Sequence, residues 1–203
     1  MPFTPDHHWY DFNLSATKKR GPGLFLDRDG VIIEDRQYIS NPEDVAIIPG
    51  SHAAIQRFRD AGFRIVIISN QSGIGRGYYG WDEALAVQTR VQELAAQDGI
   101  IYDGVVLCPH HPEKGKGEFS KICDWRKPGS GMLTFVIENF DVDLGQSIMV
   151  GDKRSDIEAG IAAGIGRLVH VSTGHGQAER LRVKEFENDI EIEFADCLGD
   201  LEP

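Results

Sequence analysis

Short apolar runs alternate with amphipathic segments from residue 23 onward, and this alternation is the feature that most constrains the fold. Five runs have the length and composition of buried strands: 24–27 (LFLD), 64–69 (RIVIIS), 103–108 (DGVVLC), 147–152 (SIMVGD) and 166–171 (GRLVHV). A sixth run, 189–194 (DIEIEF), alternates as an edge strand does. Four segments predict helices: 50–62, 82–97, 131–140 and 155–163. Strands joined through helices predict an α/β fold with a mainly parallel sheet that helices cover on both faces.

The length and composition indicate a globular protein with no broad polyanion-binding surface. The chain has 203 residues, which suits a single domain over 23–203 preceded by an N-terminal arm over 1–22. Its formal net charge of −11 argues against a nucleic-acid or anionic-membrane partner. Apolar stretches are shorter than the ~20 residues that span a bilayer. The three cysteines argue against a disulfide framework, and the first residues lack the features of a secretory signal. We therefore expect a cytoplasmic enzyme, and separately predict that it is a monomer.

Polar residues end three of the predicted strands. Asp27 ends the first, Ser69 and Asn70 end the second, and Asp152 ends the fourth. In an open parallel sheet the ligand crevice lies at the carboxyl ends of the strands. We therefore expect these side chains to converge on one site.

The acidic residues at these strand ends predict a Mg²⁺-dependent phosphoryl-transfer site. Mg²⁺ prefers oxygen ligands and uses one or two carboxylates, which Asp27 and Asp152 can supply together with the backbone carbonyl of Asp29. Asp27, kept ionised beside a metal, can act as a nucleophile and form an aspartyl-phosphate. Asp29, two residues further on, can protonate the leaving oxygen and then activate water. Gly30 permits the tight turn that returns the Asp29 carboxyl to the site.

Further groups can stabilise the negative charge of a phosphoryl group in transfer. Ser69 can donate its hydroxyl, and the backbone amides near Asn70 and Gln71 can join it. Lys127, in the segment DWRKPG, offers an ammonium group. Asp156 lies at a predicted helix start, where it can cap the helix and contact Lys127.

Each motif taken singly has an ordinary structural interpretation. A DRD sequence is commonly a solvated acidic turn, SNQ a turn or helix cap, and RKP an exposed basic loop. The segment 73–77 (GIGRG) lacks the full spacing of a dinucleotide-binding loop. The order of the motifs decides the matter, because each follows its own predicted strand in sequence.

Four segments carry a family resemblance: LFLDRDGVI, IISNQSGIGRG, CDWRKPGSGML and IMVGDKRSDIEAG. They resemble the four motifs of the haloacid dehalogenase superfamily and, within it, the heptose-bisphosphate and histidinol-phosphate phosphatases. The resemblance implies a Rossmann-like three-layer fold without a large cap domain. It also implies that Asp27 is the nucleophile and Asp29 the acid/base, that Mg²⁺ binds at Asp27, Asp29 and Asp152, and that Ser69 and Lys127 contact phosphate.

The same resemblance implies a phosphorylated sugar as the substrate. It implies removal of the 7-phosphate of D-glycero-D-manno-heptose 1,7-bisphosphate, a step toward lipopolysaccharide or a related surface glycan. Histidinol phosphate, or non-catalytic binding of a phosphosugar, are the alternatives. Arg126 favours a substrate with a second phosphate. The implied substrate contacts are Asp35, Arg36, Gln37, Tyr38, Asn70, Gln71, Ser72, Arg126 and Lys153.

A zinc loop of the resembled family, of the form C-x-H…C-x-C, is incomplete over residues 109–126. Cys108, His110 and Cys123 match three ligand positions, but the fourth is Trp125, whose indole cannot ligate zinc. Structural zinc sites are almost always four-coordinate. Two alternatives stay open: zinc is retained with water or His111 as the fourth ligand, or the metal is lost and Trp125 packs apolar surface in its place. The remaining chemistry-bearing histidines, His7, His8, His170 and His175, have no partner pattern and are expected to be surface or core residues.

Overall fold

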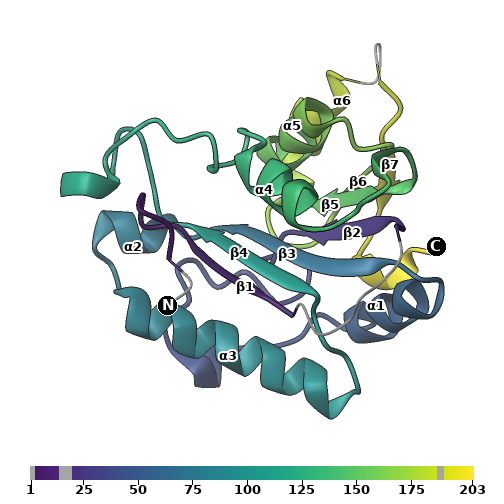
Figure 1. The fold of residues 1–203 in the computed structure, drawn as a ribbon, viewed down its shortest axis with the longest axis horizontal. Helices are drawn as coiled ribbons and strands as arrows, with labels where there is room; N and C mark the ends of the chain where they lie inside the picture. The colour runs from purple at the N-terminus through teal and green to yellow at the C-terminus, as the bar shows by residue number, and fades with distance from the viewer. Residues whose placement is uncertain (1–2, 14–19, 187–189) are drawn as a thin grey trace.

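A computed structural model of the chain describes residues 3–13, 20–186 and 190–203, and within them a seven-stranded sheet forms the centre of the fold (Figure 1). Its spatial order is β1-β4-β3-β2-β5-β6-β7. The strands are β1 (Trp9–Phe12), β2 (Gly23–Leu26), β3 (Arg64–Asn70), β4 (Gly104–Cys108), β5 (Ile148–Gly151), β6 (Arg167–Val171) and β7 (Glu193–Ala195). Only β1 runs antiparallel to its neighbour, β4, within this sheet. The mainly parallel α/β fold predicted from the sequence is confirmed.

Helices cover both faces of the sheet. The α-helices are α1 (Ser51–Asp60), α2 (Ser72–Arg76), α3 (Trp81–Gln97), α4 (Gly131–Asn139), α5 (Arg154–Ala163) and α6 (Gly176–Lys184). In the described part of the chain, 3₁₀ helices span Pro42–Asp44, Gly117–Phe119, Leu144–Gln146 and Leu198–Asp200. Figure 1 shows α1 and α3 below the sheet and α4, α5 and α6 above it. These three layers, without a large cap domain, are the architecture that the motifs imply.

Two hydrophobic cores, one on each face, follow from the alternation of side chains along the buried strands. Leu24 and Leu26 of β2 pack with Phe58 of α1 in one core. Phe25, between them in sequence, packs with Leu133 of α4 in the other. Successive strand residues point to opposite faces, so a strand buried on both sides must be apolar at every position. This is why the central strands read as continuous apolar runs.

The position of β2 creates the crevice. From β2 the chain adds β3 and β4 on one side, and later β5, β6 and β7 on the other. The strand order therefore reverses at β2, and such a switch point is where open α/β sheets bind ligands. Asp27, the residue after β2, stands between the carboxyl ends of β3 and β5.

The peripheral elements differ most from the sequence expectation. The N-terminal arm contributes β1, and α2 and α6 were not predicted. The edge strand expected over 189–194 is the shorter β7, and residue 189 lies outside the described residues. Short or polar elements carry little hydrophobic periodicity, so they leave a weak signal. None of the described helices has the length and apolar content to cross a membrane.

Candidate active site

A cavity of about 410 Å³ opens at the carboxyl ends of β2 and β3. Asp27, Asn70 and Lys127 line it together with residues that follow β5. One carboxylate oxygen from each of Asp27, Asp152 and Asp156 lies within 4.8 Å of the other two. The strand ends predicted to converge therefore form one acidic site.

Asp27 is a buried carboxylate that stays ionised. Its Oδ1 lies 3.0 Å from the Nζ of Lys127, and its Oδ2 lies 3.9 Å from the Nζ of Lys153. Burial by itself raises the pKa of Asp27, but the two ammonium groups outweigh it and hold the pKa below its ordinary value. A carboxylate in this state can attack an electrophile without first losing a proton.

Asp29 is held by a buried arginine and a glutamine. Arg28, which is fully buried, donates from Nη2 to both Asp29 oxygens at 3.0 Å, and Gln71 Nε2 donates to Oδ2 at 2.8 Å. Gln71 is itself oriented by the hydroxyl of Tyr79, which donates to Oε1 at 2.9 Å. The sequence reasoning missed Arg28 and Tyr79; the only signal for Arg28 was its position between the two aspartates of DRD.

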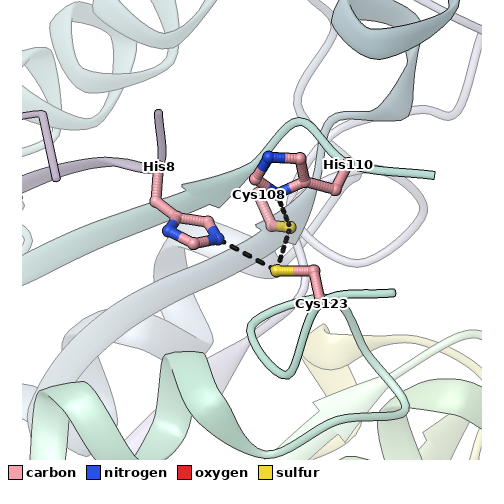
Figure 2. A group of neighbouring side chains, drawn as sticks. All are labelled: His8, Cys108, His110 and Cys123. Atoms are coloured by element: carbon pink, nitrogen blue, oxygen red, sulfur yellow. Dashed lines mark hydrogen bonds between the residues drawn. The ribbon is translucent and has the colours of Figure 1, made fainter. Parts of the chain in front are cut away.

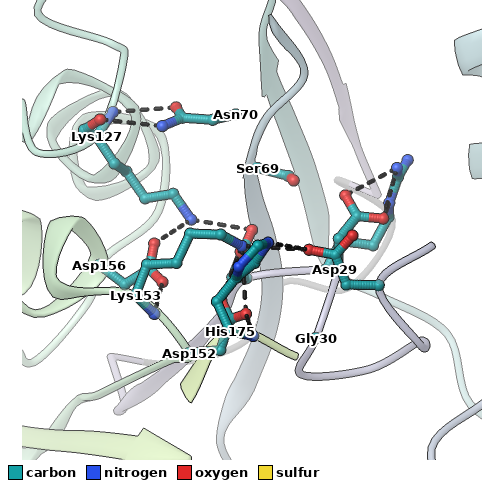
Figure 3. A network of polar contacts seen from close by, with 12 residues as sticks. Asp29, Gly30, Ser69, Asn70, Lys127, Asp152, Lys153, Asp156 and His175 are labelled. Atoms are coloured by element: carbon teal, nitrogen blue, oxygen red, sulfur yellow. Dashed lines mark hydrogen bonds and ion pairs between the residues drawn. The ribbon is translucent and has the colours of Figure 1, made fainter. Parts of the chain in front are cut away.

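Lys127 joins three parts of the site (Figure 3). Its buried Nζ lies 3.0 Å from Asp27 Oδ1 and 2.7 Å from Asp156 Oδ1, and donates to the carbonyl of Ile68 at 2.9 Å. Burial opposes the charged form, but Asp156 and Asp27 outweigh it and raise the pKa of Lys127. The side-chain amide of Asn70 bonds both the N–H and the carbonyl of Lys127 at 3.0 Å, so Asn70 positions this loop.

Asp156 has the capping and bridging role expected of it. Its Oδ2 accepts from the backbone N–H of Lys153 at 3.0 Å at the start of α5, while Oδ1 contacts Lys127. Burial, reinforced by neighbouring Asp27, raises the pKa of Asp156. The site therefore gathers more carboxylates than ammonium groups.

Asp152 is fully buried and tightly enclosed. Burial, with Asp27 and Asp156 nearby, raises its pKa to about 7, and Lys153 Nζ at 3.0 Å opposes this shift. The backbone N–H of His175 donates to its Oδ2 at 2.7 Å. A Cβ on Gly30, whose φ is +92°, would lie 2.4 Å from that same oxygen. Glycine is therefore required there for the turn and for the close approach.

The outer part of the cavity carries guanidinium and aromatic groups. Arg76 and Arg126 both line it, and Arg126 Nη1 donates to the carbonyl of His110 at 3.1 Å. Arg76 lies over the ring of Tyr38, 5.3 Å from its centroid. Gln37 and Tyr38 have φ values of 53° and 63°, a left-handed conformation that is uncommon for such residues. Gln37 and Tyr38 line the cavity, so their left-handed backbone determines the shape of this part of its wall.

The sequence-predicted substrate residues mostly line this cavity. Those that do are Asp35, Gln37, Tyr38, Asn70, Gln71, Ser72, Arg126 and Lys153. Arg36 does not line it, because its guanidinium turns to Glu34 at 3.2 Å on the exposed surface. Ser69 does not line the cavity; it is buried, and its hydroxyl accepts from Gln71 Nε2 at 3.1 Å.

A second cluster of potential ligands lies at the end of β4 (Figure 2). His8, Cys108, His110 and Cys123 each place a donor atom within 4.8 Å of the others. His8 Nε2 lies 3.0 Å from Cys123 Sγ, Cys108 Sγ lies 3.7 Å from His110 Nδ1, and the two sulfur atoms are 3.9 Å apart. The three residues predicted from the motif are therefore together, with a fourth donor that the motif lacks.

The fourth donor corrects the sequence interpretation. His8 was expected to be an ordinary surface or core histidine, but it belongs to the cluster because β1 lies beside β4. His111, the suggested substitute, instead accepts backbone N–H groups of Glu113 and Lys114 through Nδ1. Trp125 stacks on His8 with ring centroids 4.2 Å apart.

Another of the histidines expected to be ordinary also faces a site. His175 lines the active-site cavity, with Nε2 3.0 Å from Asp35 Oδ2. His7 and His170 are as expected: His7 pairs with Glu118 on the surface, and His170 is a core histidine facing the carbonyl of Gly176 at 3.1 Å. The spacing of residues in the sequence does not predict which groups these histidines contact.

Comparison with known proteins assigns the chain to a family. Residues 124–198 match the family described as HAD-hydrolase-like. Over 151 residues, 74% of this chain and 82% of the relative, the chain is 42% identical to D-glycero-beta-D-manno-heptose-1,7-bisphosphate 7-phosphatase of Haemophilus influenzae. It belongs to the D-glycero-D-manno-heptose-1,7-bisphosphate 7-phosphatase family of HAD-like hydrolases. A second relative, D-glycero-alpha-D-manno-heptose-1,7-bisphosphate 7-phosphatase of Burkholderia mallei, is 41% identical over 70% of this chain and 76% of its own.

A solved structure supports the family assignment. The D,D-heptose 1,7-bisphosphate phosphatase of B. bronchiseptica, complexed with magnesium and phosphate, matches with a TM-score of 0.75 and 29% identity. The match covers 89% of this chain and 94% of that one. The sequence resemblance that the four motifs carried is confirmed.

The acidic site of this chain fits a magnesium ion. Buried carboxylates of Asp27 and Asp152 supply the oxygen ligands that Mg²⁺ prefers. Together with Asp156 they outnumber the two ammonium groups of Lys127 and Lys153 that contact them. Burial, and after it the charges of Asp27 and Asp156, raise the pKa of Asp152. A divalent cation would supply the missing positive charge.

Proposed function

We propose that this chain is a Mg²⁺-dependent phosphatase that removes the 7-phosphate of D-glycero-D-manno-heptose 1,7-bisphosphate. The observation that carries the proposal is Asp27, an ionised carboxylate in the cavity at the end of the central strand. Its chemical surroundings match the activity that the similar phosphatases are named for.

In the first step, a carboxylate oxygen of Asp27 attacks phosphorus and the bond from phosphorus to the sugar oxygen breaks. Asp29 gives its proton to that oxygen, so that the sugar leaves as an alcohol. In the structure Arg28 and Gln71 hold the Asp29 carboxyl. This role therefore requires Asp29 to turn from Arg28 toward the bound phosphate, as catalytic groups often tighten only in the substrate complex.

In the second step, Asp29 takes a proton from water, and the resulting hydroxide attacks the phosphorus of the aspartyl-phosphate. The bond from phosphorus to Asp27 breaks, and inorganic phosphate leaves. Lys127 stays beside Asp27 through both steps, where its fixed ammonium stabilises charge on the transferring oxygens. Mg²⁺, held by Asp27, Asp152 and the backbone carbonyl of Asp29, would neutralise phosphate charge there.

The outer cavity supports a bisphosphate as the substrate. Arg76 and Arg126 line it beyond the acidic site, and a guanidinium can bind a second phosphate through two parallel hydrogen bonds. The competing substrate, histidinol phosphate, would need an acidic partner for its amine. Asp35 is the acidic candidate in that region, and Lys153 and His175 already contact it, at 3.6 Å and 3.0 Å.

Steady-state kinetics on a substrate panel test the proposal. The panel contains both anomers of the heptose bisphosphate, histidinol phosphate and an aryl phosphate, each assayed with Mg²⁺. We expect the highest kcat/KM with one bisphosphate anomer, and loss of turnover on every substrate in Asp27→Asn. Preference for histidinol phosphate would overturn the substrate assignment. Tight sugar-phosphate binding with equal, negligible turnover in both proteins would instead identify a non-catalytic binder.

The cellular setting follows from the same proposal. The product, a heptose 1-phosphate, would supply nucleotide-activated heptose for lipopolysaccharide or a related surface glycan. We place the enzyme in the cytoplasm as a monomer; its three cysteines, all in described regions, are free thiols, which suits a reducing compartment. Light scattering during size-exclusion chromatography tests the monomer.

A further inference from the structure

We propose that His8 is the fourth ligand of a closed zinc site with Cys108, His110 and Cys123, and that this site fastens the N-terminal segment to the loop before Arg126. The proposal concerns metal binding and holds whatever the substrate of the acidic site. It replaces the ligand that the family's motif places at position 125, where this chain has tryptophan.

Strand pairing explains how a residue 100 positions away in sequence reaches the loop. In the antiparallel pair of β1 and β4, Trp9 faces Leu107. Continuing the register by one residue puts His8 opposite Cys108, and directly opposed side chains in such pairs are neighbours. The histidine is thus delivered by backbone hydrogen bonds rather than by local sequence.

The donor spacings fit tetrahedral zinc. With Zn–S near 2.3 Å and Zn–N near 2.0–2.1 Å, two sulfur ligands lie about 3.8 Å apart, and a sulfur and a nitrogen ligand about 3.6 Å apart. The corresponding distances are 3.9 Å between Cys108 and Cys123, 3.7 Å between Cys108 and His110, and 3.0 Å between His8 and Cys123. A small outward movement of His8 closes the last difference.

Charge and burial also fit. Two thiolates and two neutral imidazoles around Zn²⁺ have no net charge, so the filled site suits a location where His8, Cys108 and His110 are buried. All four positions of the tetrahedron come from the protein. A site of this kind has no position left for water and is structural.

Two neighbours orient the His8 ring for this role. The hydroxyl of Thr4 lies 3.0 Å from Nδ1 and can accept a hydrogen bond from it, an arrangement that leaves the lone pair of Nε2, 3.0 Å from Cys123 Sγ, for the metal. Trp125 stacks on the face of the His8 ring with an interplanar angle of 17°. The residue that cannot ligate zinc therefore holds the ring of the residue that can.

The consequence reaches the active site through the backbone. The carbonyl of His110 accepts from Arg126 Nη1 at 3.1 Å, and Arg126 lines the cavity. Fixing His110 by metal therefore fixes the partner that positions this guanidinium. The same metal joins residues 3–13 to the loop over 109–126.

Metal content and affinity of the purified full chain test the proposal. We expect about one zinc per chain by elemental analysis. Loss of a residue that only hydrogen-bonds a metal ligand typically lowers metal affinity about 10- to 100-fold. In chelator competition, Thr4→Val should lower zinc affinity by a factor in that range, and His8→Ala should lower it by more. His7→Ala is the matched control, since His7 adjoins His8 but pairs with Glu118 on the surface, and it should bind as wild type does.

Cobalt substitution identifies the ligand directly. Co²⁺ in the wild-type site should show the intense visible absorption of a four-coordinate thiolate complex, and His8→Cys should add thiolate charge-transfer absorption. Trp125→Cys introduced into His8→Ala restores the C-x-H…C-x-C set and should recover zinc binding, which separates ligand loss from misfolding. A wild-type chain that purifies without zinc and binds none, or a cobalt spectrum that His8→Cys leaves unchanged, would overturn the proposal.

Discussion

Replacement of Lys127 by methionine tests the electrostatics on which the active site depends. The change keeps the apolar stem and removes an ammonium group that lies 3.0 Å from Asp27 and 2.7 Å from Asp156. Both carboxylates are buried, so each loses a partner that solvent cannot replace. Removing one partner of a buried ion pair typically costs about 3–5 kcal/mol of unfolding free energy.

For a chain of this size that loss corresponds to about 6–20 °C in Tm, since 1 kcal/mol shifts Tm by about 2–4 °C. Urea unfolding in Mg²⁺-free buffer, followed by tryptophan fluorescence, measures the loss of unfolding free energy. Lys121→Met is the matched control, because Lys121 makes a 2.8 Å ion pair with Asp6 on the surface. Exposed pairs contribute about 0.2–1 kcal/mol, so this variant should be nearly as stable as wild type.

The pH dependence has a definite sign. In the wild type the pKa of Asp27 is held low, so its contribution to stability is present above its ordinary pKa and is lost as the pH falls. Without Lys127 the stranded carboxylates favour their protonated forms, so the stability deficit should shrink toward acidic pH. Adding Asp156→Asn should recover part of the loss. A Lys127→Met chain as stable as wild type at neutral pH would refute this reasoning.

Three further outcomes follow from the site. Because burial raises the pKa of Asp152 to about 7, Mg²⁺ must displace a proton from Asp152 below that pH. The apparent Kd for Mg²⁺, measured by calorimetry, should therefore rise about tenfold for each pH unit below about 7. Equal Kd values at about pH 5.5 and about pH 7.5 would contradict this. Gly174→Ala places a Cβ 2.3 Å from Asp152 Oδ2 and should weaken Mg²⁺ binding, whereas Gly62→Ala, also at positive φ but with open space, should bind Mg²⁺ normally. Arg126→Met should raise KM for the bisphosphate about 10- to 150-fold, the factor that corresponds to the loss of a hydrogen bond to a charged group. KM for an aryl phosphate, which has no second phosphate, should not change. Equal effects on the two substrates would show that Arg126 does not bind the second phosphate.

The amino-acid sequence determined the sheet and the place of the acidic site. A strand buried on both faces has to be apolar throughout, so β2, β3 and β5 can be recognised in the sequence as apolar runs. The polar residues at the ends of these runs can be recognised in the same way. The rule that ligands bind at the carboxyl ends then brings Asp27 and Asp152 together without any coordinates. Local pattern and topology suffice for groups attached directly to strand ends.

Tertiary structure alone decided which side chains complete the sites. Asn70 holds the backbone of Lys127 and His8 reaches Cys123, although nothing in their spacing pairs them. Arg28 adjoins Asp29 in sequence, but that its buried guanidinium turns to the Asp29 carboxyl is seen only in the structure. Such contacts depend on side-chain direction and on which strands are neighbours. A strand of four residues such as β1 has too little periodicity to predict which strand it pairs with. His8, the residue before β1, is therefore recognisable as a ligand only once the pairing of β1 with β4 is known.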